Sequence, residues 1–260
     1  MNVLQNLVNM YNALPIDSNY RSVLKAILLN VRHLGSATIY EIAELTASSR
    51  TTIWRLVKTL GYRNFSDFSH ELSSAVTRYP YYNRMDMGDA TPGLDACADK
   101  VRTNLKSALA ALDHLDAGMA ARIVDRIDAA RRVGFYGFEG NPYIRALQEN
   151  LAMNGKESNC FVLLPDMLRD AAGTDADSLT FVRTLEFSTT MDLAPVFETL
   201  RKRGGTVALL HSGTESRHRK HVDFVLNELY RTTERTGVVL SGIMTMALLN
   251  ELYRGRFVEA

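Results

Sequence analysis

Apolar side chains recur every three or four positions through the first 77 residues, and this spacing predicts a series of amphipathic helices. Pro15 and Gly35 mark two of the breaks between these helices. The segment from residue 49 to residue 60 carries one apolar stripe, made of Ile53, Leu56, Val57 and Leu60. The predicted helices cover residues 3–14, 20–34, 38–45, 49–60 and 66–77.

The N-terminal part is organised around the helix predicted at residues 49–60. Ser49 is a natural N-cap for it, and Gly61 is a natural stop. The preceding helix begins with a capping box between Thr38 and Glu41. A short helix, a tight turn at residues 46–48 and a second helix with a basic face are typical of a helix-turn-helix. The face opposite the apolar stripe contains no acidic residue and is made of Arg50, Thr51, Thr52, Arg55 and Lys58.

This basic face predicts contact with double-stranded DNA. In a helix docked in the major groove, the N-terminal residues meet base edges and later cations meet phosphates. Arg55 lies beyond the first turn, so a phosphate contact and a structural role in the fold remain alternatives to a base contact. Trp54 is expected to pack against the domain or to lie partly exposed rather than to wedge between bases. From the pattern alone, a solvated helix face is the alternative. The expected DNA-binding residues are Ser49, Arg50, Thr51, Thr52, Arg55 and Lys58.

The pattern changes after residue 131, where short apolar runs alternate with amphipathic helices. Strand and helix in alternation at this spacing predict a parallel sheet covered by helices on both faces. The predicted strands cover residues 133–136, 159–164, 180–185, 206–211 and 222–227. The predicted helices of this half cover residues 94–115, 116–130, 142–153, 192–203 and 234–253.

Between the two patterns, residues 79–93 contain Pro80, Gly88, Pro92 and Gly93 and have little regular periodicity. We interpret this stretch as a linker. The sequence therefore predicts an all-α helix-turn-helix domain at residues 1–78, the linker at 79–93, and an α/β domain at 94–260. The second domain is expected to be an αβα sandwich around a parallel sheet.

Composition and charge add limits to this picture. The net charge of the 260-residue chain is +1, but residues 1–80 carry +3 and residues 81–260 carry −2, so the mildly basic half is the one with the helix-turn-helix. Cys97 and Cys160 lack metal-ligand spacing and are expected to be reduced thiols. The first residues do not form a signal peptide, and no apolar run is long enough to span a membrane. We expect a cytoplasmic protein with no membrane segment, no metal and no cofactor.

The N-terminal pattern resembles the RpiR/MurR-type bacterial transcription regulators. The residues that carry the resemblance are Ser49, Thr52, Arg55, Leu60-Gly61-Tyr62 and Phe65. Members of that family join an N-terminal helix-turn-helix to a C-terminal sugar isomerase (SIS) domain, and the strand and helix order of the second half is SIS-like. The resemblance covers residues 3 to 255.

The resemblance also implies a ligand site, at the loops that follow the first and third strands. In SIS domains these loops bind a phosphosugar with hydroxyls and helix N-terminal amides. Here Glu139 and Glu186 bring negative charge to the two loops, so we expect common sugar phosphates to bind weakly and a less anionic molecule to fit better. The candidate ligand-binding residues are Gly137, Gly140, Asn141, Ser188, Thr189 and Thr190.

The sequence thus predicts a DNA-binding transcription regulator rather than an enzyme. Its SIS-like domain is expected to dimerise and to sense a small, sugar-related effector. A two-fold pair of helix-turn-helices implies a palindromic operator, and the chain is expected to form a homodimer or a higher homo-oligomer, partly through the helix containing residues 244–249. Two alternatives remain open: a sugar-phosphate isomerase with an accessory helical domain, and a SIS oligomerisation module without a ligand.

Overall fold

The computed structural model describes residues 3–87, 93–113, 115–138, 140–185, 192–212, 218–227 and 235–257. The chain divides into two compact units. The first contains residues 1–91 with the short segments 162–166 and 187–192, and the second contains the remaining residues. None of the described helices is long and apolar enough to cross a membrane.

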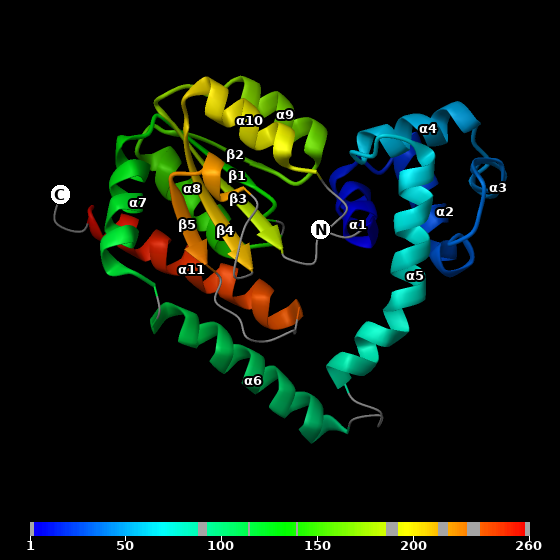
Figure 1. The fold of residues 1–260 in the computed structure, drawn as a ribbon, viewed down its shortest axis with the longest axis horizontal. Helices are drawn as coiled ribbons and strands as arrows, with labels where there is room; N and C mark the ends of the chain where they lie inside the picture. Colours follow the sequence, from blue (N-terminus) through cyan, green and yellow to red (C-terminus); the bar gives the residue numbers. More distant parts are fainter. Residues whose placement is uncertain are drawn as a thin grey trace. The chain divides into compact units, whose positions relative to one another are not determined.

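The N-terminal unit is helical, as the sequence predicts (Figure 1). Helix α1 packs against α2 and α5, α2 against α3, and α4 against both α3 and α5. The apolar stripes of these helices meet in one core that includes Leu7, Leu24, Ile42, Ile53 and Leu72. Its elements are α1 (Val3–Ala13), α2 (Asn19–Asn30), the 3-10 helix η1 (Val31–His33), α3 (Ile39–Leu45), α4 (Arg50–Thr59) and α5 (Phe65–Met87).

Helix α5 is longer than the sequence predicts. It continues through Pro80 to Met87, whereas the irregular linker was expected to begin at residue 79. Proline removes one backbone hydrogen bond and disfavours the helical conformation of the residue before it, but a long helix can tolerate both effects. The interpretation of residues 79–93 as a linker between domains stays a prediction.

The C-terminal unit is built on a five-stranded sheet in the order β2-β1-β3-β4-β5, and every neighbouring pair is parallel (Figure 1). This confirms the predicted α/β fold. The strands are β1 (Arg132–Tyr136), β2 (Glu157–Phe161), β3 (Ser178–Leu185), β4 (Thr206–Ser212) and β5 (Phe224–Asn227). The helices are α6 (Leu94–Asp113), α7 (Ala117–Ala129), α8 (Pro142–Met153), α9 (Leu164–Ala172), α10 (Ala194–Arg203) and α11 (Arg235–Gly255), with the 3-10 helix η2 (Arg219–His221).

The two faces of this sheet differ in chemistry. Helices α7, α8 and α11 cover one face, and α6 packs along α11 (Figure 1). The strands give this face an apolar core that includes Val133, Phe135, Phe181 and Leu210. Helices α9 and α10 lie over the other face. Because side chains alternate along a strand, Arg132 and Tyr136 point to the face opposite Val133 and Phe135.

Helix α9 is an element that the sequence analysis missed. The run from Cys160 to Leu164 was predicted as the end of a strand, but β2 ends at Phe161 and α9 begins at Leu164. The apolar run continues from the strand into the helix without a polar break, so hydrophobicity alone does not mark the boundary. Pro165 lies in the first turn of α9, where its fixed φ is compatible with a helix.

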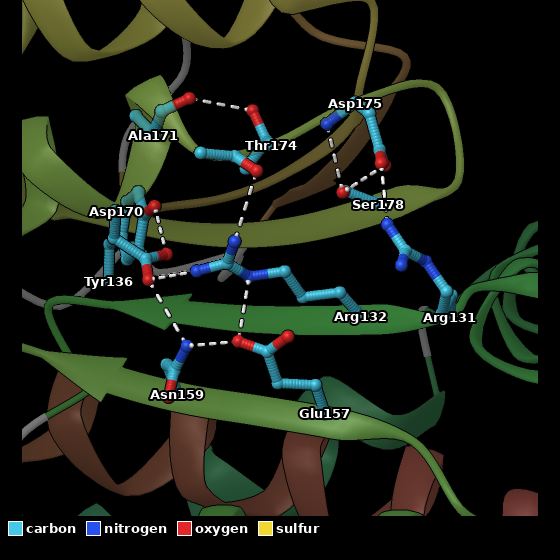
Figure 2. Close-up of polar contacts among 11 residues, drawn as sticks. Arg131, Arg132, Tyr136, Glu157, Asn159, Asp170, Ala171, Thr174, Asp175 and Ser178 are labelled. Carbon is cyan, nitrogen blue, oxygen red and sulfur yellow. Dashed lines mark hydrogen bonds and ion pairs between the residues drawn. The ribbon is translucent and has the colours of Figure 1, made fainter.

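A polar network ties α9 to the sheet (Figure 2). The Asp170 carboxylate accepts hydrogen bonds from the Tyr136 hydroxyl at 2.6 Å and from the Asn159 amide at 3.1 Å, and it pairs with the Arg132 guanidinium. The Arg132 guanidinium also donates to the Gly173 carbonyl at 3.1 Å. Burial raises the pKa of Tyr136, and the hydrogen bond to Asp170 raises it further. In this part of the interface, polar contacts rather than apolar ones join α9 to the sheet.

Candidate nucleic-acid interface

The turn between α3 and α4 sets the angle of the helix-turn-helix. Ala47 has a φ of 47°, which for a residue with a Cβ costs about 1 kcal/mol. The Ser48 amide donates to the Ala43 carbonyl at 2.9 Å, and the Thr46 hydroxyl lies 2.7 Å from that of Ser48. These contacts stabilise the turn and offset the strain at Ala47.

Both ends of α4 are formed as the sequence predicts. The Ser49 hydroxyl is the N-cap and accepts from the Thr52 amide at 3.1 Å. Gly61, just after the C-cap Leu60, has a φ of 94°, a conformation that favours glycine. The predicted capping box of α3 is also present, since Thr38 and Glu41 bond reciprocally. The hydrogen bonds from Thr38 lower the pKa of the Glu41 carboxyl.

The structure separates the buried and exposed sides of α4 along the predicted line. The buried side is the stripe of Ile53, Leu56, Val57 and Leu60. On the other side, the side chains of Ser49, Arg50, Thr51 and Arg55 are exposed, and those of Thr52 and Lys58 are half-buried. All six candidate DNA-binding residues therefore lie at or beside one solvent-facing surface. We name this surface the α4 face.

Two aromatic side chains, neither among the predicted binding residues, lie against cations of the α4 face. Tyr40 on α3 is 63% exposed, its hydroxyl accepts from Arg50 Nη1 at 2.9 Å, and its ring centre lies 4.6 Å from the guanidinium carbon. Trp54 is 48% exposed, and Lys58 Nζ lies 5.2 Å from its ring centre. Such contacts are cation–π interactions. The signal in the sequence is an aromatic residue at an outward position of each helix, which the apolar stripe does not absorb.

Lys58 is also part of the fold. Its ammonium donates to the Arg63 carbonyl, in the turn after α4. The sequence analysis treats Lys58 only as a phosphate contact. The structure assigns it this additional contact, so removing its charge also perturbs the end of α4.

The first of the two predicted ligand loops follows β1, at the carboxyl edge of the parallel sheet. In sheets with this strand order, ligands bind outside the carboxyl ends of the strands where the order reverses, which here is between β1 and β3. Gly137 follows β1 with a φ of 82°, and a Cβ on it would lie 3.0 Å from the Arg183 carbonyl oxygen. Gly140 has a φ of 69°. Asn141 caps α8 by accepting from the Tyr143 amide at 3.0 Å, and its amide lies 3.5 Å from the Gly242 carbonyl.

The other candidate loop lies outside the described residues, and so do Ser188, Thr189, Thr190, Glu139 and Glu186. A described polar pair at this edge joins β3 and β4, where Thr184 Oγ1 lies 2.8 Å from His211 Nδ1. Among the described residues, no group of three or more histidine, cysteine or carboxylate side chains could hold a metal ion.

Comparisons with known proteins agree with this geometry. The family model described as "Helix-turn-helix domain, rpiR family" matches residues 1–78. The bifunctional protein glk of Paraburkholderia xenovorans is 32% identical over 129 residues, and that of Burkholderia thailandensis is 31% identical over the same length. The match takes 48% of this chain but 20% of each relative. The chain therefore spans about a fifth of the length of the curated relatives it matches.

Solved structures with a similar fold cover the second half as well. The Vibrio vulnificus NanR protein complexed with ManNAc-6P aligns over 99% of this chain and 94% of that chain, with 21% identity and a TM-score of 0.53. The sugar isomerase domain of an RpiR transcription factor from Sphaerobacter thermophilus aligns over 60% of this chain and 88% of that chain, with 16% identity and a TM-score of 0.47. Residues 1–78 therefore match the helix-turn-helix domain of the rpiR family, and the α/β domain that follows has a fold similar to that of the corresponding part of NanR.

Proposed function

We propose that this protein is a transcription regulator that binds double-stranded DNA through the α4 face. The observation that carries the proposal is the exposed and acid-free row of hydroxyls and cations on the second helix of an RpiR-type helix-turn-helix. Hydroxyls and guanidinium groups near the N-terminus of such a helix suit base edges, and the cations suit phosphates. Such a regulator works on chromosomal DNA, so its expected location is the cytoplasm.

The chain is proposed to act as a homodimer on a palindromic operator. One helix-turn-helix covers only a half-site, so a second copy supplies the other half. An exposed apolar flank of α6, formed by Leu94, Val101, Leu105 and Leu109, supports self-association. Within residues 244–249, Met246 and Leu249 are fully buried in the core of one chain. The α6 flank is therefore a better candidate for the interface than that whole stretch.

The C-terminal domain is proposed to bind a small, sugar-related effector at the carboxyl edge of its sheet. The turn at Gly137 and the capped α8 N-terminus at Asn141 support a site there. NanR, a protein of the same fold, was captured with a sugar phosphate, which makes that class the first to test. The acidic Glu139 and Glu186 favour an amino sugar or neutral sugar over a dianion.

DNA binding is tested by selection from a random duplex pool, followed by fluorescence anisotropy with the enriched sequence and an unrelated one. Wild type should enrich a palindrome. The double variant Arg50→Ala/Thr52→Ala should lose most of the preference, and Arg32→Ala, which removes an exposed cation from η1 outside α4, should keep it. No enriched sequence, or the same preference in the double variant, would contradict the proposal.

The effector is tested by thermal shift and titration calorimetry with hexose phosphates, amino sugars and neutral sugars. A ligand that binds only the folded state raises the melting temperature. Asn141→Ala should lower the affinity for the ligand that the wild type binds. Interconversion of a sugar phosphate by the wild-type chain would favour the isomerase alternative, and no binding of any class would favour the ligand-free module.

A further inference from the structure

We propose that Tyr40 is a positioning residue for DNA recognition, which holds the Arg50 guanidinium in place on the α4 face before DNA binds. The inference rests on the proposed function, since it concerns how one contact of the α4 face is prepared. Tyr40 lies on α3, ten residues before Arg50. The two side chains are brought together only by the helix-turn-helix angle.

The contact between the two side chains is a specific one. The Tyr40 ring faces the Arg50 guanidinium at 4.6 Å, and the Tyr40 hydroxyl accepts from Arg50 Nη1 at 2.9 Å. The ring fixes the plane of the guanidinium, and the hydrogen bond fixes its rotation within that plane. Both groups are exposed, so this pair adds little to the core.

The held guanidinium keeps the donors that a base needs. Arginine has five N–H donors in a planar fork, and the Tyr40 hydroxyl takes one of them. The other N–H groups of Arg50 have no hydrogen-bond acceptor among the described residues, so a fork remains for the O6 and N7 acceptors of a guanine. A long side chain that is already ordered loses less conformational freedom when it binds. The pair therefore favours specific binding, because it lowers the entropy cost of one base contact.

Arg55 provides a contrast on the same face. Within the part of the chain that the structure describes, its guanidinium has no hydrogen bond or ion pair, and its side chain is exposed. An arginine without a fixed orientation suits a phosphate better than a base edge. The structure thus distinguishes a held arginine, which reads sequence, from an unheld one, which adds sequence-independent affinity.

The test compares operator and unrelated DNA in anisotropy titrations over a range of salt. Tyr40→Phe keeps the ring over the guanidinium and removes the hydrogen bond, and Tyr40→Leu removes both. We expect Tyr40→Phe to weaken operator binding by about two- to tenfold, the effect of one exposed hydrogen bond. We expect Tyr40→Leu to weaken operator binding further. The affinity for unrelated DNA and the melting temperature should be unchanged in both variants.

A matched control exists in the same domain. Arg21 lies over the Tyr11 ring at 4.3 Å, between α1 and α2. Tyr11→Phe should leave both kinds of DNA binding unchanged. Combined with Arg50→Ala, Tyr40→Phe should cause no further loss, because the hydroxyl then has nothing to hold.

Three outcomes would overturn the inference. If Tyr40→Phe equals wild type while Arg50→Ala is impaired, Tyr40 does not position the arginine, and the proposed function stands. If the two losses add and Tyr40→Phe lowers the affinity for all DNA alike, with an unchanged salt slope because the hydroxyl carries no charge, Tyr40 is itself a phosphate contact. If wild type prefers no DNA sequence, the proposed function and this inference fail together.

Discussion

Replacing Asp170 by asparagine should destabilise the C-terminal domain far more than the same change at a neighbouring, exposed aspartate. The Asp170 side chain is 5% exposed and that of its partner Arg132 is 16% exposed. Asparagine is nearly isosteric and can still accept from the Tyr136 hydroxyl. The change therefore removes the charge and leaves the packed volume almost unaltered.

The size of the effect follows from the partners that remain. Removing one member of a buried ion pair typically costs about 3–5 kcal/mol, because the other charge stays buried and uncompensated. Here Glu157 lies 3.5 Å from Arg132 and provides partial compensation. We therefore expect a loss of about 2–3 kcal/mol in the free energy of unfolding. With a urea dependence of about 2 kcal/mol per M, the midpoint should fall by about 1–1.5 M.

Asp175 is the matched control, since it pairs with Arg131, the residue before Arg132. The Arg131–Asp175 pair is 2.8 Å long with side chains 74% and 42% exposed. An asparagine Oδ1 can still accept from Ser178 Oγ and from the Asp177 amide, so Asp175→Asn should change the midpoint little. Urea unfolding is followed by circular dichroism. The fluorescence of Trp54, the only tryptophan, follows the N-terminal domain separately.

A double-mutant cycle completes the test. Arg132→Met and Asp170→Leu should each destabilise the domain, whereas the two changes together should recover part of the loss, because the apolar pair leaves no buried charge. The reasoning would be refuted if Asp170→Asn shifted the midpoint no more than Asp175→Asn. A strictly additive cycle would equally show that the two groups do not act as a pair.

Three further predictions address single features. Tyr253→Phe should be neutral or slightly stabilising in urea titration, because the Tyr253 hydroxyl is buried without a hydrogen-bond partner among the described residues, and burial raises its pKa to about 12. Tyr136→Phe should instead lower the free energy of unfolding by about 1–3 kcal/mol, because it removes the hydrogen bond to Asp170. The hydrogen bonds from Thr38 hold the pKa of the Glu41 carboxyl below its ordinary value of 4.5, so the contribution of Glu41 to stability is present above that pH and is lost as the pH falls through the lowered value. Acid titration of Trp54 fluorescence should show this loss in wild type and not in Glu41→Gln. Gly137→Ala should lower the melting temperature, because the left-handed φ and the nearby Arg183 carbonyl leave no room for a Cβ, and an unchanged value would contradict the observed turn.

The N-terminal domain could be predicted from its sequence because its determinants are local. The capping box at Thr38, the N-cap Ser49 and the left-handed Gly61 each act within one turn of the residues that carry the signal. The apolar stripe of α4 then decides which side faces solvent. The Tyr40–Arg50 contact could not be read in this way, because it depends on the angle between two helices.

The C-terminal domain shows where local reasoning fails. The parallel pairing follows from the alternation of strands and helices, but α9 was missed because its apolar run continues that of β2. The role of Asp170 was missed as well. Its partners Tyr136 and Arg132 lie 34 and 38 residues away in sequence, and only the packing of α9 on the sheet brings them together with Asp170.

The two candidate sites differ in how far function can change without changing the fold. On the α4 face, the residues proposed to read DNA are outside the apolar stripe, so a different operator preference needs only exposed substitutions. At the carboxyl edge of the sheet, Gly137 and Asn141 are candidate ligand residues that also form a left-handed turn and the α8 cap. A substitution there that changes the effector preference also changes the backbone conformation of the β1–α8 loop. Variants of Arg50 or Thr51, which neither cap α4 nor bond its end, should therefore lose DNA preference at constant melting temperature, while variants of Gly137 or Asn141 should alter ligand affinity and stability together.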